Sequence, residues 1–304
     1  MAQSCKTVSY GSSGVDIRSI MAIVDGGIES KNVLMTAIEL GQRFDAVTML
    51  LQVTPPSAQF IYPSLEASSS QAINDIISGM EKAVEDRKVF FETLYNKEVI
   101  DAGVPTVPVE DISNTVKFAI SKETIIGHDN REIAERGRLF DLIVIGMPNE
   151  DSGGVDSAAL EAALLDTARP VLITCKYPRP IVGGHITIAW DGSREAAQSI
   201  RNALPLMAGA TNIEVVHVVQ EGMPESDPDD ICKYLRMHGI VAKARKILSH
   251  EGNIGDALLN AVRGNSHALL IMGAYGSSAV AEYIFGGATR AVMTKADIPL
   301  LVSH

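Results

Sequence analysis

The glycines near the C-terminal end of the chain have the spacing of a phosphate-binding loop. The apolar run Leu269–Met272 is followed by Gly273-Ala-Tyr-Gly276, and nine residues later Gly286-Gly287-Ala288-Thr289-Arg290 opens a helical stretch. Glycines after a parallel strand let backbone N–H groups approach phosphate oxygens, and a helix N-terminus adds its positive dipole end. On spacing alone, the alternative is a tight glycine turn that binds nothing.

Four polar or aromatic side chains could complete such a site. Arg290 could pair with a terminal phosphate through its guanidinium, or it could be an exposed helix arginine or the partner of a carboxylate. Asp191 precedes Gly192, so it could bind a ligand or simply form the turn. His217 is expected to be a hydrogen-bonded strand histidine, and Trp190 to pack beside a strand end or to stack near a base.

These residues belong to the second of two repeated units. The 304 residues are enough for two domains of about 150 each, which favours a duplication. Three landmarks recur in the same order: IRSIMAIVDGG at Ile17–Gly27 and HITIAWDGS at His185–Ser193, FDLIVIGMPN at Phe140–Asn149 and HALLIMGAYG at His267–Gly276, ARPVLIT at Ala168–Thr174 and IPLLVS at Ile298–Ser303.

Between the landmarks, β-branched runs alternate with stretches of helical spacing, which predicts parallel sheets. Runs such as LIVIG and LLIMG are apolar on both faces, as in strands covered by helices on both sides. The sequence therefore predicts an α/β fold of two tandem doubly wound, Rossmann-like domains, each a mostly parallel five-stranded sheet flanked by helices.

We place the first domain at residues 17–176 and the second at 185–304, after a flexible N-terminus at 1–16 and before a Pro/Gly-rich linker at 177–184. The first unit carries extra material at 54–115, with a long helix predicted around Gln71–Asn96, which we interpret as a packing insert. In the second unit a helix is expected from the N-cap Ser193, although Pro205 argues against its later part.

Composition restricts the function classes. The net charge of −11 argues against binding to nucleic acid or anionic lipid, because both depend on neutralising phosphates with Lys and Arg. Cys5, Cys175 and Cys232 have no disulfide-framework or metal-ligand spacing, no run of 18 apolar residues occurs, and no export signal is recognised. We therefore expect a cytoplasmic protein that does not enter membranes.

The GxxGx9G pattern, the strand ending in Asp191-Gly192-Ser193 and the segment Val216–Val219 together resemble the universal stress protein family, from Ile17 to His304. The resemblance implies ATP or another adenine nucleotide, with Mg²⁺ able to arrive with ATP. It implies that Asp191 bonds the adenosine and that the backbones of Ala189 and Val218 frame the adenine. By the same resemblance, Gly273 and Gly276 hold the ribose and first phosphate, and the later phosphates contact Gly286, Gly287, Ala288 and Thr289.

One position departs from the family pattern. The family usually has Ser or Thr directly after the last motif glycine, whereas this chain has Gly287. The lost hydroxyl removes one hydrogen bond to a charged group, worth about 1.5–3 kcal/mol, while the backbone N–H remains. Binding should be weakened rather than abolished.

The first unit lacks this pattern. Its loop reads Gly146-Met-Pro-Asn149 followed by Glu150 and Asp151, so Pro148 removes a backbone donor and the acidic pair repels phosphate. Asp25 remains at its strand end, either as a turn residue or as a remnant of a site. One nucleotide per chain is predicted.

Enzyme motifs are missing. The sequence has no GxGxxG after its first strand, no GxxxxGK[ST] and no GxSxG, and no general base stands near the proposed terminal phosphate, so any ATP hydrolysis should be slow. A stress or signalling protein that binds a nucleotide and a nucleotide-free interaction scaffold both fit, with a slow ATPase as a third hypothesis. The resemblance further implies that Val171–Thr174 and Leu300–Ser303 pair across the two domains as an intrachain pseudo-dimer, and a homodimer stays open.

Overall fold

The computed structural model describes most of the chain. The described residues are 16–27, 29–54, 70–115, 117–148, 157–175, 181, 184–219, 226–249, 253–263, 268–274 and 287–304. The flexible N-terminus predicted at 1–16 lies outside them except for Asp16, as does most of the predicted linker. The domain boundaries stay predictions.

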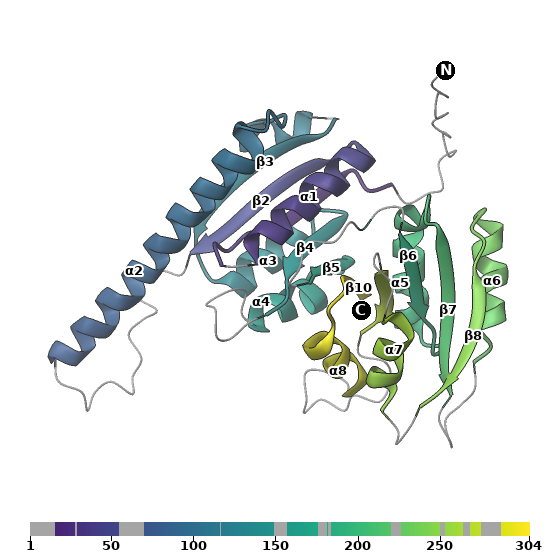
Figure 1. Ribbon diagram of the computed structural model, residues 1–304. Coiled ribbons are helices and arrows are strands. Elements are labelled where there is room, and N and C mark those ends of the chain that lie inside the picture. The colour runs from purple at the N-terminus through teal and green to yellow at the C-terminus, as the bar shows by residue number, and fades with distance from the viewer. Residues whose placement is uncertain are drawn as a thin grey trace.

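Strands and helices alternate along both halves of the chain, as the hydrophobic pattern predicts (Figure 1). The first half contains β1 Ser19–Ile23, α1 Ser30–Phe44, β2 Val47–Thr54, α2 Ser70–Tyr95, a π-turn Asn96–Ile100, a 3₁₀ turn Val109–Asn114, β3 Ala119–Ile126, α3 Asp129–Gly137, β4 Leu142–Gly146, α4 Ser157–Glu161, a π-turn Ala162–Asp166 and β5 Val171–Thr174. The second half contains β6 His185–Ala189, α5 Arg194–Met207, β7 Asn212–Val219, α6 Pro228–Met237, β8 Lys243–Leu248, α7 Ile254–Val262, β9 Ala268–Gly273, α8 Gly287–Lys295 and β10 Leu300–Ser303.

The two halves share one sheet. Its ten described strands follow the order β3-β2-β1-β4-β5-β10-β9-β6-β7-β8. All neighbours are parallel except β5 and β10, which pair antiparallel with Leu301 opposite Leu172. The predicted pairing of the two final strands is therefore confirmed, and each five-stranded half has the predicted doubly wound order.

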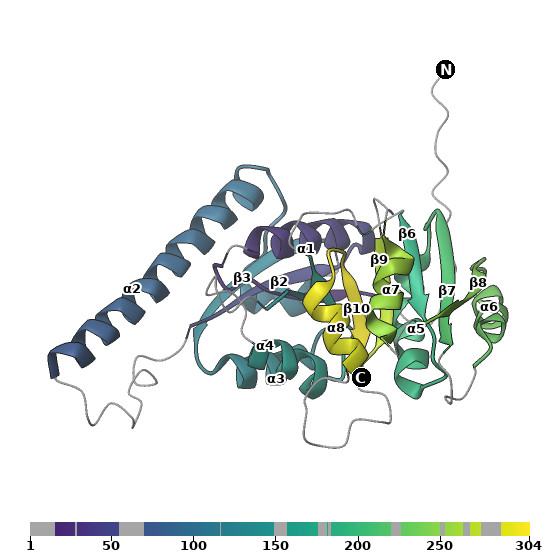
Figure 2. The same cartoon turned by 60° about the horizontal axis from the view of Figure 1, so that its bottom comes forward.

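Two hydrophobic layers cover the two faces of this sheet. On one face, helices α1, α2, α5 and α6 contribute buried residues such as Leu34, Phe91, Ile200 and Leu235. On the other face lie α3, α4, α7 and α8, and Figure 2 shows α1 and α3 on opposite sides of the sheet. Each layer contains residues from both halves, so the core continues across the β5–β10 junction.

The extra segment of the first half contains the long helix that the sequence predicts. Helix α2 projects from the body of the molecule in both views (Figures 1 and 2). Its C-terminal part is anchored by the buried side chains of Phe91, Leu94 and Tyr95, whereas Ile76 on the projecting part is exposed. The interpretation as a packing insert therefore fits the last turns of the helix.

Pro205 does not interrupt helix α5, so the helix predicted after Ser193 is confirmed. The helix begins after the predicted N-cap Ser193, whose Oγ accepts the Ala196 N–H at 3.1 Å, and it continues through Pro205 to Met207. Pro205 lies in the last turn, where its ring costs the helix one hydrogen bond but its fixed φ still suits the helical backbone.

Candidate functional site

The second half brings several of the predicted site residues to the carboxyl edge of its sheet. Ala189 ends β6, Val218 lies next to the end of β7, and Gly273 ends β9. Strands β6, β7 and β9 are parallel neighbours, so these positions and Asp191 share one edge. Ligands of open α/β sheets bind at this kind of edge.

Asp191 forms the turn that leaves β6. Its Oδ1 accepts the Ser193 N–H at 2.9 Å, and Ser226 Oγ donates to the Asp191 carbonyl at 3.2 Å. Gly192 has a φ of +82°, and a β-carbon there would lie 2.2 Å from Ser226 Oγ, so the turn requires glycine. Asp191 is therefore a turn residue, but its side chain is exposed and this turn uses only one carboxylate oxygen.

His217 is the hydrogen-bonded strand histidine that the sequence predicts. The ring is buried, with 4% exposed, and Nδ1 lies 2.8 Å from the Trp190 carbonyl oxygen. A carbonyl can only accept, so Nδ1 carries the proton, and Nε2 accepts the Ser226 N–H at 3.5 Å. His217 thus connects the ends of β6 and β7 to the segment before α6, and Trp190 packs partly buried against the core.

Gly273 lies where β9 meets the N-terminus of α5. A β-carbon on Gly273 would lie 2.6 Å from the Ala196 nitrogen and 2.9 Å from Glu195 Cβ. Only glycine allows this approach of two backbones. The end of β9 and the first turn of α5 are consequently adjacent at the candidate site.

Glu195 is a site neighbour that the sequence argument missed. Only 4% of the residue is exposed, although it is ionisable, and its Oε1 accepts a hydrogen bond from Arg194 Nε at 2.5 Å. Burial raises the pKa of this carboxyl, but hydrogen bonds from Arg194 and the backbone, with the charges of Arg194 and His304, leave the pKa below its ordinary value. The site edge therefore carries a buried negative charge.

The repeat contains a signal for this glutamate. Glu29 follows Asp25-Gly26 at the spacing at which Glu195 follows Asp191-Gly192. Glu29 is also buried, and a β-carbon on Gly146 would lie 3.2 Å from Glu29 Cβ, which matches the contact of Glu195 with Gly273. The Asp-Gly-x-x-Glu pattern thus marks the same junction in both units.

The remaining predicted contacts surround the N-terminus of α8. Gly287 begins this helix, Thr289 is buried, and Ala288 and Arg290 lie in its first turns. Gly276 and Gly286 lie outside the described residues. The phosphate roles of these residues stay predictions.

Comparisons with known proteins show which proteins this chain is similar to. The model of the universal stress protein family matches residues 184–304. A universal stress protein of Synechocystis is 28% identical over 298 residues, covering 94% of this chain and 99% of the relative. The second unit is thus the part of the chain that matches the universal stress protein family. The alignment with the Synechocystis relative extends over both repeated units of this chain.

Solved structures share the fold over nearly the whole chain. The crystal structure of a universal stress protein from Archaeoglobus fulgidus matches with a TM-score of 0.60 at 16% identity, covering 94% of this chain and 97% of the other. A protein of unknown function from Pseudomonas aeruginosa PAO1 matches with a TM-score of 0.55 at 15% identity, covering 96% and 94%. At these identities the likeness shows the fold alone.

The first unit of the chain has a different environment at the equivalent edge. Asp25 Oδ1 accepts from the Gly27 N–H and from Ser30 Oγ, and its other oxygen is buried without a partner among the described residues. A β-carbon on Gly26 would lie 2.4 Å from the Arg87 carbonyl oxygen of helix α2. Helix α2 therefore packs directly on the turn that a ligand of this unit would have to reach.

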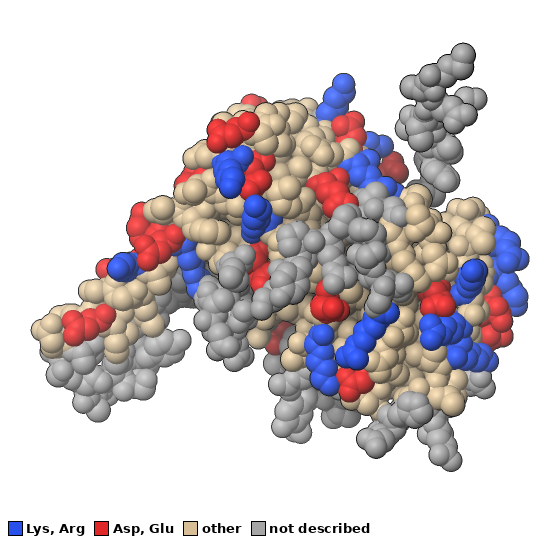
Figure 3. Space-filling view, viewed as in Figure 1, with Lys and Arg blue, Asp and Glu red and all other residues tan. Residues whose placement is uncertain are grey.

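Two further findings concern the described part of the chain. No group of three or more His, Cys, Asp or Glu side chains is arranged to hold a metal ion within the described ranges. Among the helices that the structure describes, none is long and apolar enough to cross a membrane. Figure 3 shows acidic and basic side chains interspersed over the face it presents.

Proposed function

We propose that this chain binds one adenine nucleotide at the carboxyl edge of its second unit and acts as a stress-response or signalling binder. The ligand would be ATP, ADP or AMP, and Mg²⁺ would reach the site together with ATP. We place this activity in the cytoplasm, with which the buried thiol of Cys232, outside any disulfide, is consistent.

The close approach at Gly273 is the observation that carries the proposal. It sets the backbone after β9 against the first turn of α5, at the edge that also holds the exposed Asp191 side chain. A glycine turn between a strand end and helix N-termini offers backbone N–H groups to an anion, and α8 begins at Gly287, in the second part of the motif. The buried charge of Glu195 works against phosphate, so we expect modest affinity.

The main test is a calorimetric titration of the intact chain with ATP, ADP and AMP. We expect one site per chain, weaker binding for Asp191→Ala, and unchanged binding for the matched first-unit variant Asp25→Ala. Binding should also raise the melting temperature by linkage. Two equivalent sites would contradict the proposal, and no heat with no thermal shift at millimolar nucleotide would favour the nucleotide-free scaffold.

A second titration tests the phosphate end of the site. Arg290→Ala should weaken ATP more than adenosine, because only ATP offers a terminal phosphate to the guanidinium. Arg290→Lys keeps the charge without the planar fork and should lose less. Equal losses for ATP and adenosine would exclude a phosphate contact.

A further inference from the structure

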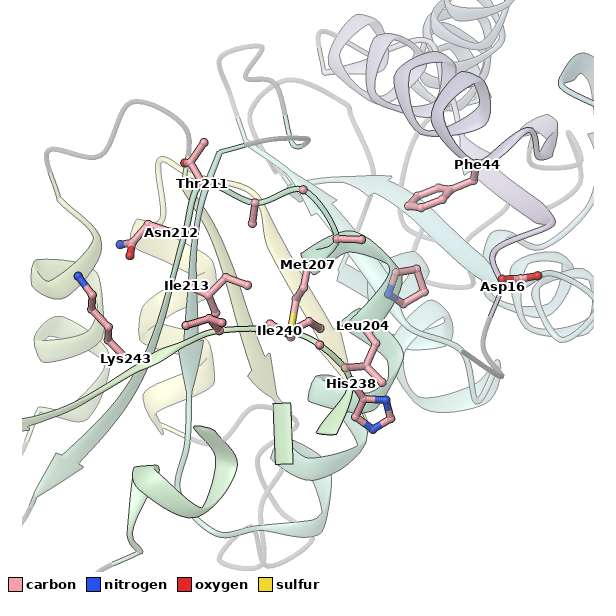
Figure 4. A pocket seen from close by; sticks show the side chains of 16 residues that line it. Asp16, Phe44, Leu204, Met207, Thr211, Asn212, Ile213, His238, Ile240 and Lys243 are labelled. Carbon is pink, nitrogen blue, oxygen red and sulfur yellow. The ribbon is translucent and has the colours of Figure 1, made fainter. Parts of the chain in front are cut away.

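A groove lies at the other end of the second unit from the proposed nucleotide site. Its volume is about 600 Å³, within the range of about 300–1,000 Å³ typical of small-molecule sites. The turn between α5 and β7 and the turn between α6 and β8 form its sides, and Phe44 at the end of α1 closes it from the first unit (Figure 4). We call this the interunit groove.

The floor of the interunit groove is apolar. It is formed by side chains that belong to the core beneath the two turns, namely Leu204, Met207, Ile213 and Ile240. At the rim, Val241 is 78% exposed, and Met237 on the adjoining end of α6 is 79% exposed. An apolar body lying here would remove exposed apolar surface from water, which is favourable at about 25 cal/mol per Å².

One end of the groove carries a lysine without an acidic partner. Lys243 stands opposite Glu214 in the β7–β8 register, but the Glu214 carboxylate bonds Arg245 Nη1 at 3.3 Å. Within the described part of the chain, Lys243 makes no ion pair. Of the charged side chains that line the groove in the described part of the chain, Asp16 is paired with Arg18 at 3.0 Å, which leaves the Lys243 ammonium outside an ion pair. Arg43 also approaches the groove beside Gly209, where its guanidinium donates to the Ala208 carbonyl.

The arrangement of charge along the groove points to one class of ligand. Figure 4 shows Lys243 at one end and Phe44 at the other, with Ile213, Met207 and Leu204 between them. We infer that the interunit groove binds a free amphipathic monoanion, with its anionic head at Lys243 and its apolar body along the floor toward Phe44. This site is separate from the nucleotide site and does not depend on the proposed function.

A free amphiphile is favoured over the surface of an anionic membrane. The chain has a net charge of −11, which repels an extended anionic surface, whereas a single anion within a concave groove can lie with its charge at Lys243. The groove also lies between two units that are held together here, since Arg43 Nη2 donates a hydrogen bond to the Ala208 carbonyl.

Dodecanoate is a suitable probe, measured by calorimetry on the full chain with dodecyltrimethylammonium as its cationic counterpart. We expect one dodecanoate site and no binding of the cation. Lys243→Met keeps the apolar stem and should lower dodecanoate affinity roughly fivefold, the scale of a partly exposed ion pair. Lys233→Met changes the net charge equally on the exposed face of α6, where Lys233 bonds Asp230, and should have no effect.

A second pair of variants separates charge from shape. Val241→Asp places a negative charge beside Lys243 and should weaken dodecanoate further than Val241→Asn, which has nearly the same volume. ATP should not displace dodecanoate. No dodecanoate binding at millimolar concentration, equal binding of the cation, or unchanged affinity in Lys243→Met would each overturn the inference. If the chain bound phosphatidylglycerol vesicles but did not bind free dodecanoate, the inference would be overturned in favour of a membrane contact.

Discussion

Gly273 is the residue on which the geometry of the candidate site depends most directly. In Gly273→Ala the new methyl group would meet the backbone of Glu195 and Ala196, and backbone cannot move aside as a side-chain tip can. Overpacking of this kind costs about 1–3 kcal/mol, which we expect in the free energy of unfolding from urea titrations. Gly79→Ala is the control, because a β-carbon there meets nothing within 4 Å and helix α2 should gain up to about 1 kcal/mol. Equal effects at the two positions would contradict the close approach.

Glu195 predicts a pH dependence of stability. Its folded-state pKa lies below the ordinary 4.5, so the ionised carboxylate stabilises the fold above that value. This contribution is lost as the pH falls through the lowered folded pKa. The difference in unfolding free energy between wild type and Glu195→Gln should therefore be largest near neutrality and should shrink below pH 4.5. Glu135→Gln, which removes an exposed ion pair with Arg131, should change the unfolding free energy little; if it matched Glu195→Gln, the hydrogen bonds and charges around Glu195 would not be the cause.

At the residue scale, the sequence predicted local turns, caps and hydrogen bonds better than contacts with residues far along the chain. The turn at Asp191, the N-cap at Ser193 and the satisfied His217 follow from local chemistry, which acts over a few residues. Glu195 was missed because its burial depends on β9, more than 70 residues further along the chain, as the contact with Gly273 shows. Spacing within one segment contains no information about such a contact unless the two repeats are compared position by position.

At the scale of elements, the formation of helix α2 follows from a local pattern, whereas its anchoring depends on long-range contacts. Its apolar residues recur at helical spacing along its whole length, so the sequence predicted a long helix but not which part of it is anchored. The anchor depends on the turn at Gly26, where the Arg87 carbonyl seals the edge of the first unit, and this contact is also long-range. The position of α2 is consistent with the prediction, made from the degenerate loop, that the first unit binds no nucleotide.

The anchoring of α2 can be tested by truncating side chains along it. Phe91→Ala should lower the unfolding free energy by about 3–5 kcal/mol, since the ring is fully buried against the core. Ile76→Ala, on the projecting part, should change it by no more than about 0.5 kcal/mol because the side chain is 42% exposed. Chemical denaturation followed by circular dichroism measures both. A large loss for Ile76→Ala would mean that the projecting part of α2 is packed against something.

For the whole molecule, the family resemblance implied that the final strands would pair, but nothing in the sequence indicated that the two units would share continuous core layers. Both hydrophobic layers contain residues of both halves, and Leu301 faces Leu172 across the antiparallel junction. Matched landmarks reveal two copies, whereas the relation between the copies depends on side chains that meet only in the folded chain. A junction of this kind resembles the interior of one domain more than a contact between separate domains.

The continuous core predicts that the chain unfolds as one cooperative unit. Trp190 is the single tryptophan of the chain and lies after β6, so its fluorescence reports on the second half. Ile120→Ala removes a fully buried side chain from β3, at the opposite end of the strand order, and should cost about 2–5 kcal/mol. If the two halves share one transition, the Trp190 fluorescence midpoint should shift to lower urea by the same amount as the circular dichroism midpoint. A Trp190 transition that stays at its wild-type midpoint would show that the second half unfolds independently, and the junction would then be only a contact between two autonomous domains.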